Sequence, residues 1–145
     1  MTDYQHILCV VDLSDENFIV ASRAAELATR YQAELRLLHV VEYIPIDLAN
    51  ELVLPQQQEI EEQLVIQAKK NLAALAAKIA VDQLQTVVVQ GSTKSEILAY
   101  AEVHHSDLIV LGRHSRHGLS RLLGSVANAV LHDATCDVMT VKVGK

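Results

Sequence analysis

The feature that most constrains the fold is a set of short apolar runs, rich in β-branched residues, that alternate with stretches of helical periodicity. Apolar runs without polar alternation are typical of strands buried on both faces, as in parallel sheets. The alternation predicts right-handed crossovers and an α/β fold, a single doubly wound, mainly parallel sheet of about five strands with helices on both faces. The predicted strands are Ile7–Val11, Leu35–Val41, Gln85–Gln90, Leu108–Leu111 and Val138–Val143.

Helical patterns fill the connections between these strands. Ser14 is placed to cap the first helix, and Thr93 with Glu96 has capping-box spacing ahead of a third. The range Gln57–Val81 contains no Gly or Pro and predicts one long helix, whereas the mixed stretch Ile44–Pro55 before it predicts a loop. The apolar face of the long helix is expected to include Ile60, Leu64, Gln67, Ala68, Leu72, Leu75 and Ile79.

Composition supports one domain over residues 1–145. Half of the 145 residues are hydrophobic but only 3% are aromatic, so the core must be built from Ala, Val, Ile and Leu. The net charge is −6 and no run of Lys or Arg is dense, which argues against nucleic acid as a partner. The polar N-terminus lacks a secretory signal and no apolar run reaches the ~20 residues of a membrane span. We therefore expect a cytoplasmic protein with no membrane partner.

The two cysteines do not have the spacing of a disulfide framework or a zinc site. Cys9 lies within an apolar run and Cys136 directly precedes another, so both are interpreted as small buried hydrophobes. The alternative is a redox-sensing thiol, which would need an exposed and electropositive setting.

Candidate binding residues follow the predicted strands. In doubly wound sheets, ligands bind beyond the carboxyl ends of the strands, where the strand order reverses. Asp12 follows the first strand, Val40 and Val41 end the second, and Gly112–Ser115 follows the fourth. Asp12 could bind a ribose hydroxyl or a metal ion carried by a nucleotide, or could simply accept hydrogen bonds from the turn that follows it.

A glycine and a serine mark the predicted start of the last helix. Gly124 and Ser125 stand where free backbone N–H groups and the helix dipole would favour an anion, and Gly112 permits close backbone approach. These residues are consistent with a phosphate site. Gly and Ser are also common at the ends of strands and helices for purely structural reasons. The residues alone leave this structural interpretation open.

Five segments together resemble the universal stress protein family. The range Gly112–Val126 looks like the signature loop of that family, and His6–Ser14 resembles its opening strand and turn. The ranges Leu37–Val41, Asp107–Gly112 and Cys136–Val141 resemble its second, fourth and last strands. The resemblance spans nearly the whole chain in order and implies a Rossmann-like fold of the adenine nucleotide alpha hydrolase-like kind.

The loop departs from the nucleotide-binding branch of that family. Binding members carry Gly, two residues, Gly, nine residues, then Gly followed by Ser or Thr. Here Ser115 stands at the second glycine, and eight residues, Arg116–Leu123, precede Gly124. The shorter loop resembles the A-type branch, whose members are regarded as not holding ATP, although Gly124 and Ser125 are closer to the binding pattern.

The residue pattern alone requires no cofactor. The family resemblance implies ATP with Mg as the candidate ligand. It implies that Asp12 and the Val40 backbone lie near the nucleoside. Cationic groups at Arg113 and a hydroxyl donor at Ser115 suit a phosphate. The nucleotide-binding residues carried over are Asp12, Val40, Gly112, Arg113, Ser115, Gly124, Ser125 and Val126.

No catalytic or metal site is assigned. His114 and His117 are three apart and His104 and His105 are adjacent, yet no Cys or carboxylate stands at a companion spacing. The serines lie in no nucleophile elbow, and no evident general base accompanies them. We therefore expect no enzyme, with a weak ATPase as the least favoured alternative. A nucleotide-loaded synthase would need a glycine-containing pyrophosphate loop, which Asp12–Glu16 lacks.

The last strand, Val138–Val143, is expected at the edge of the sheet. An exposed edge rich in Val invites pairing with another copy, and family members commonly dimerise through this strand. We expect a homodimer with these strands antiparallel. The first functional hypothesis is a non-catalytic stress-response protein acting as this dimer with an unknown protein partner, and the second is an ATP-binding regulatory switch.

Overall fold

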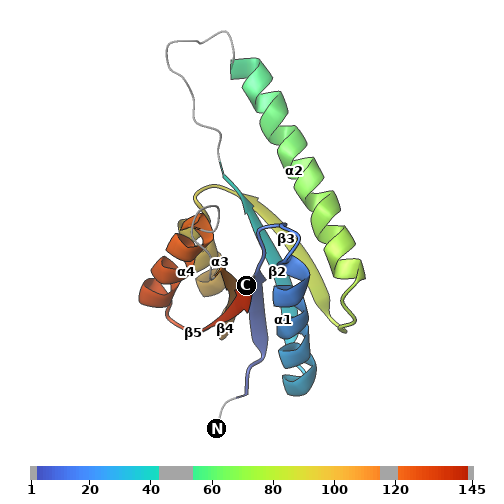
Figure 1. Cartoon of the computed structure of the whole chain (residues 1–145), viewed down its shortest axis with the longest axis vertical. Coiled ribbons are helices and arrows are strands. Elements are labelled where there is room, and N and C mark those ends of the chain that lie inside the picture. Colours follow the sequence, from blue (N-terminus) through green and yellow to red (C-terminus); the bar gives the residue numbers. More distant parts are fainter. Residues whose placement is uncertain (1–2, 43–53, 115–120, 144–145) are drawn as a thin grey trace.

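The computed structural model describes residues 3–42, 54–114 and 121–143, which form one five-stranded sheet flanked by helices (Figure 1). The strand order is β3-β2-β1-β4-β5 and every neighbouring pair is parallel. The strands are β1 (His6–Val10), β2 (Glu34–Val41), β3 (Leu84–Gln90), β4 (Leu108–His114) and β5 (Asp137–Val143). The helices are α1 (Asn17–Tyr31), α2 (Leu54–Ala77), α3 (Thr93–Val103) and α4 (Arg121–Asp133). The predicted α/β class is confirmed.

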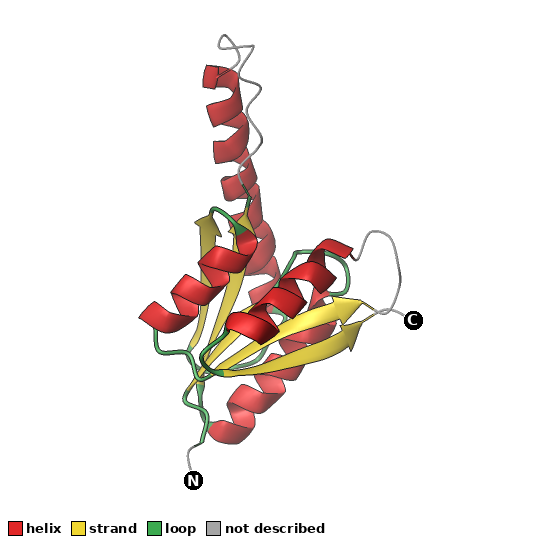
Figure 2. Ribbon diagram, turned by 90° about the vertical axis from the view of Figure 1, so that its left-hand side faces the viewer, coloured by secondary structure: helices red, strands yellow, loops and turns green. Residues whose placement is uncertain are grey.

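Helices cover both faces of the sheet, α1 and α2 on one side and α3 and α4 on the other (Figures 1 and 2). Successive residues of a strand point to opposite faces, so β1 contributes Ile7 and Cys9 to the α1/α2 layer and Leu8 and Val10 to the α3/α4 layer. All four side chains are buried. Burial on both faces explains why the strands appear in the sequence as continuous apolar runs.

The long helix differs from its prediction at both ends. It begins at Leu54, so Pro55 lies in the first turn, where a missing N–H costs no helical hydrogen bond. Its N-terminal half rises beyond the end of the sheet (Figure 1), and this leaves Ile60 51% and Leu64 44% exposed. Gln67 is exposed as well, so only the later part of the predicted apolar face is buried. The buried residues of that predicted face are Ala68, Leu72, Leu75 and Ile79, and the last of these lies beyond the end of the helix at Ala77.

Two predicted helix caps are wrong. The N-cap of α1 is Glu16 and not Ser14, and the N-cap of α3 is Ser92, with no side-chain capping bond at either position. Thr93 is the first helical residue of α3, and its hydroxyl donates to the carboxylate of Glu42 at the end of β2. The loop predicted between the second strand and the long helix lies mostly in residues 43–53, outside the described part of the chain.

Candidate functional site

The strand order reverses between β1 and β4. From β1 the chain adds β2 and β3 on one side, then crosses to β4 and β5 on the other. The ladder from β1 to β2 ends at the pair Val10 and Leu38, and the ladder from β1 to β4 ends at Val10 and Leu111. Both neighbouring strands continue past these pairs, so the carboxyl end of β1 is flanked by strand segments with no β1 partner. This is where ligands bind in doubly wound sheets.

The turn after β1 is held by a closed set of hydrogen bonds. The Asp12 backbone N–H donates to Oδ1 of Asn17 at 3.0 Å, and Oδ1 of Asp12 accepts from the Ser14 N–H at 3.0 Å. The Ser14 carbonyl in turn accepts from the Asn17 N–H at 3.2 Å. Leu13 within this turn has a φ of 62°, a left-handed conformation that costs a residue with a Cβ about 1 kcal/mol. The turn presents Asp12 as an exposed residue.

The end of β2 places Val40 two residues past Leu38, the last β2 residue that pairs with β1. The carbonyl of Leu38 accepts from the Val11 N–H at 2.9 Å, so Leu38 directs its backbone groups toward β1. Residues two apart on a parallel strand direct these groups to the same side, so the N–H and C=O of Val40 also face the β1 side. The Val40 side chain is buried in the α3/α4 layer. The backbone groups of Val40 thus point toward the carboxyl end of β1, where Asp12 lies.

The end of β4 brings Gly112 to the same place. Gly112 is buried and lies in register with Val141 of β5, and Arg113, which is exposed, lies in register with Lys142. A small cavity of about 10 Å³ is bounded by both Asp12 and Gly112. The structure therefore joins two of the predicted site residues. The cavity is lined by Val10, Asp12, Ser14, Glu16, Asn17, Val20, Gly112 and Val143.

Three of the remaining predicted residues, Gly124, Ser125 and Val126, lie in α4. Ser115 lies outside the described residues. The helix begins at Arg121, a turn earlier than expected, so Gly124 and Ser125 lie inside it and not at its cap. Gly124 is the fourth residue of α4 and therefore lies in the first turn, where helical N–H groups lack intrahelical partners, whereas Ser125 lies one residue beyond it. Ser125 is exposed, and Val126 is half-buried against the α3/α4 layer.

Comparison with known proteins assigns the chain to a family. The sequence profile described as the Universal stress protein family matches residues 3–142. This chain belongs to the universal stress protein family. It is 40% identical over 138 residues to Universal stress protein A homolog 1 of Coxiella burnetii, a match that covers 95% of this chain and 96% of that protein.

Solved universal stress proteins have the same fold. The universal stress protein UspA from Lactobacillus plantarum is 28% identical and has a TM-score of 0.80, covering 97% of this chain and 99% of that one. The universal stress protein from Archaeoglobus fulgidus in complex with dAMP is 20% identical with a TM-score of 0.67, covering 97% of this chain and all of that one (100%). These matches agree with the Rossmann-like fold expected from the sequence.

The thiols of this universal stress protein are poorly suited to redox chemistry. Cys9 is fully buried, and burial raises its pKa to about 12. Cys136 is half-buried, and burial followed by the charges of Asp137 and Asp107 raises its pKa too. A reactive cysteine needs a lowered pKa, so the redox-sensing alternative loses support.

The histidines do not form a metal site in the described part of the chain. No cluster of three or more His, Cys, Asp or Glu side chains there could hold a metal ion. His104 instead stacks on Tyr100, with ring centroids 4.0 Å apart, and both His104 and His105 are exposed. His117 lies outside the described residues. Within the described ranges, no helix combines the length and apolar character that a bilayer crossing needs.

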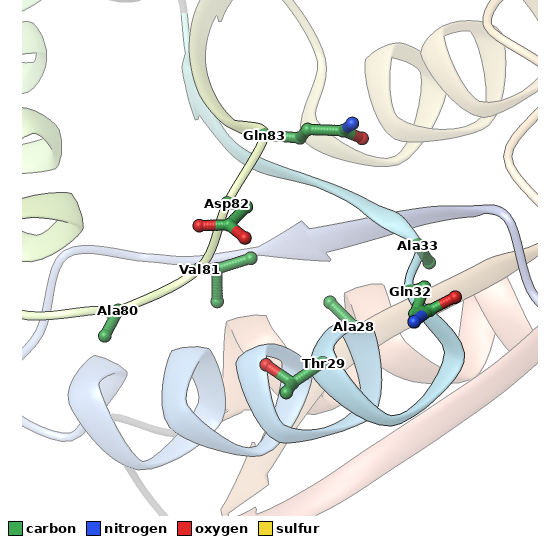
Figure 3. A pocket seen from close by; sticks show the side chains of 8 residues that line it. All are labelled: Ala28, Thr29, Gln32, Ala33, Ala80, Val81, Asp82 and Gln83. Atoms are coloured by element: carbon green, nitrogen blue, oxygen red, sulfur yellow. The ribbon is translucent and has the colours of Figure 1, made fainter.

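A second hollow lies at the opposite, amino-terminal end of the sheet and was not anticipated from the sequence. It has a volume of about 470 Å³ and lies between the end of α1 and the segment that leads into β3 (Figure 3). Four of the residues that line it are small and apolar, and four are polar. They are Ala28, Thr29, Gln32, Ala33, Ala80, Val81, Asp82 and Gln83. This hollow shares no lining residue with the site at the carboxyl ends.

Proposed function

We propose that this universal stress protein is a non-catalytic stress-response protein of the cytoplasm that acts as a homodimer and is gated by an adenine nucleotide. The nucleotide would lie at the carboxyl ends of β1, β2 and β4, where the strand order reverses. The observation that carries the proposal is the open space at the position that a Cβ on Gly124 would occupy, in the first turn of α4.

Among the described residues, nothing packs against Gly124 closely enough to require glycine. A Cβ added there would meet no heavy atom within 4 Å among the described residues. Glycine inside a helix is destabilising by roughly 0.5–1 kcal/mol relative to alanine. A residue that lowers helix stability without improving packing suggests that something outside the fold approaches its backbone. A phosphate group at the start of α4 would benefit from the positive end of the helix dipole.

The other site residues suit the nucleoside end of such a ligand. Asp12 is exposed at the turn after β1, where a carboxylate oxygen can accept a hydrogen bond from a ribose hydroxyl. The backbone N–H and C=O of Val40 point toward the carboxyl end of β1, and Arg113 is exposed at the end of β4. Ser115, Ser125 and Val126 are assigned to the phosphate end by family resemblance.

The ligand class draws on a relative. The universal stress protein from Archaeoglobus fulgidus was solved with dAMP, which is an adenine nucleotide. For this chain we infer the same class, with ATP as the cellular candidate. Since the described residues hold no cluster of metal ligands, Mg²⁺ would arrive on the phosphates of ATP. We assign the bound nucleotide a regulatory role.

The dimer would form through β5. This strand lies at the edge of the sheet with one side of its backbone hydrogen-bonded to β4. Val138, Met139 and Thr140 are half-buried in the single chain, and the outer side of β5 can pair with a second copy. A two-fold axis would make the two β5 strands antiparallel and merge the sheets into one.

Thermal unfolding of the nucleotide-free protein tests the nucleotide assignment. Millimolar AMP or Mg-ATP at ~100 times its dissociation constant should add about 2.7 kcal/mol to the free energy of unfolding, a rise in Tm of about 5–10 °C for a domain of this size. Mg-GTP is the control and should leave Tm unchanged. An unchanged Tm with every nucleotide would mean that the shortened loop has closed the site, and would leave the dimer surface as the seat of function.

A further inference from the structure

Asn17 is the one buried polar residue in the described part of the chain. It is the first residue of α1 and is only 5% exposed. Its Oδ1 accepts the Asp12 N–H, whereas its Nδ2 has no hydrogen-bond partner among the described residues. A buried donor without a partner costs about 1–3 kcal/mol. The Nδ2 end of Asn17 therefore lowers stability, and the contact that an apolar side chain of similar shape would lose is the one between Oδ1 and the Asp12 N–H.

The contacts of Asn17 point instead to the turn that carries Asp12. The Asn17 side chain accepts a hydrogen bond from the Asp12 N–H, and the Asn17 N–H donates to the Ser14 carbonyl. The Asp12 carboxylate accepts from the Ser14 N–H. These three hydrogen bonds enclose Leu13 and stabilise its left-handed backbone conformation. Asn17 also lines the small cavity between Asp12 and Gly112, so it borders the site without taking part in its outer surface.

We propose that Asn17 is a positioning residue of the site: its carboxamide fixes the backbone at Asp12 and thereby sets where the Asp12 carboxylate lies. The consequence for nucleotide affinity rests on the proposed function, because Asp12 is assigned there to the ribose. Holding a binding group in place before the ligand arrives strengthens binding by removing the entropy cost of ordering it.

The first test needs no ligand. In the Asn17→Leu variant, whose side chain has the branching of Asn without its polar atoms, the Asp12 amide proton should lose its protection from hydrogen exchange. The Val11 amide, which donates to Leu38, should keep its protection. If Asp12 stays as protected as in the parent protein, the proposal is overturned. Should Asn17→Leu fail to fold, Asn17→Ala removes the same polar atoms without adding volume.

The second test uses AMP in a double-mutant cycle. Asn17→Leu should weaken AMP binding about tenfold in the parent protein, but less than about twofold in an Asp12→Ala background, because Asn17 acts through Asp12. An equal loss in both backgrounds would overturn the proposal. Leu72→Ala is the control, since Leu72 is fully buried in the same α1/α2 layer but does not line this cavity. It should lower the free energy of unfolding and leave AMP affinity unchanged.

The two tests separate this inference from the proposed function. If the parent protein binds no AMP but Asp12 loses exchange protection in Asn17→Leu, the nucleotide assignment fails and the control of the turn by Asn17 stands. If the parent binds AMP and the exchange of Asp12 is unchanged, the nucleotide assignment stands and the role of Asn17 is refuted.

Discussion

The hydroxyl group of Tyr4 donates a 2.7 Å hydrogen bond to Oδ2 of Asp137, 133 residues further along the chain. The bond joins the residues before β1 to the start of β5, although β4 lies between these two strands. The Tyr4 ring also meets the ring of Tyr31 edge-on, with centroids 5.0 Å apart. The amino-terminal edge of the sheet is thus fastened by contacts between segments that are remote in sequence.

The Tyr4 bond predicts a specific alkaline instability. The hydrogen bond to Asp137, then burial and nearby charge, raises the pKa of Tyr4 to about 12. A folded-state pKa above the unfolded value of about 10 means that this contribution is complete below pH 10 and is lost as the pH rises toward 12. Tyr4→Phe should lower the free energy of unfolding by at most about 1 kcal/mol at pH 8.

Denaturant titrations at several pH values between 8 and 12 would measure this effect. The difference between the parent and Tyr4→Phe should shrink across that range. Tyr31→Phe is the matched control, because it keeps the edge-on ring contact and leaves the bond to Asp137 intact. A difference that stays constant up to pH 12 would contradict the assignment of the alkaline loss to Tyr4.

Gly124 predicts opposite effects on stability and on binding. Gly124→Ala should raise the free energy of unfolding by up to about 1 kcal/mol, because the new Cβ meets open space and alanine favours the helix. The same methyl group should weaken AMP binding by blocking close approach to the backbone. Asn128→Ala, at an exposed position of the same helix, is the control for helix propensity and should leave AMP affinity unaltered. Calorimetry measures both quantities, and unweakened AMP binding in Gly124→Ala would remove the support that Gly124 gives the site.

The α3/α4 layer depends on Ile97. This side chain is fully buried, so Ile97→Ala should lower the free energy of unfolding by about 2–5 kcal/mol through lost burial and a residual cavity. Val103→Ala, in the same helix but 69% exposed, should change it by less than about 0.5 kcal/mol. Urea unfolding compares the two variants, and similar losses would mean that the packing of α3 differs from that described.

The edge strand predicts the oligomeric state. Sedimentation at micromolar concentration should give the mass of a dimer. Thr140→Lys places a charge in the middle of β5 and should produce a monomer with unchanged secondary structure, because opposed lysines repel and disfavour edge pairing. Thr135→Lys makes the same change at an exposed residue before the strand and should remain dimeric. A monomeric parent protein would refute pairing through β5.

Periodicity was sufficient to predict the sheet but not the ends of its helices. Strands buried on both faces leave uninterrupted apolar runs, so β1 and β2 could be recognised directly. The limits of α2 and α4 depend on tertiary context. The helical pattern of α2 continues through Ile60 and Leu64, but the sheet beneath it ends first, and nothing local to the sequence records where the sheet ends.

The candidate site was predictable only in outline. Asp12 and Gly112 could be brought together because the carboxyl ends of parallel strands share one edge. Asn17 was missed, because a polar residue at the start of a helix is normally exposed and gives no sign of burial. The bond between Tyr4 and Asp137 was also invisible, since a single pair of polar residues so far apart in sequence carries no periodic signal.

The register of Gly112 with Val141 has a consequence for the whole protein. It puts the proposed nucleotide site and the proposed dimer edge on adjacent hydrogen-bonded strands, about 4.8 Å apart. If nucleotide binding at Gly112 alters the pairing of β5, linkage requires that dimerisation alter nucleotide affinity by the same factor. The ligand response of a cell would then depend on how many copies of this chain it contains, so that abundance and nucleotide level are sensed as one quantity.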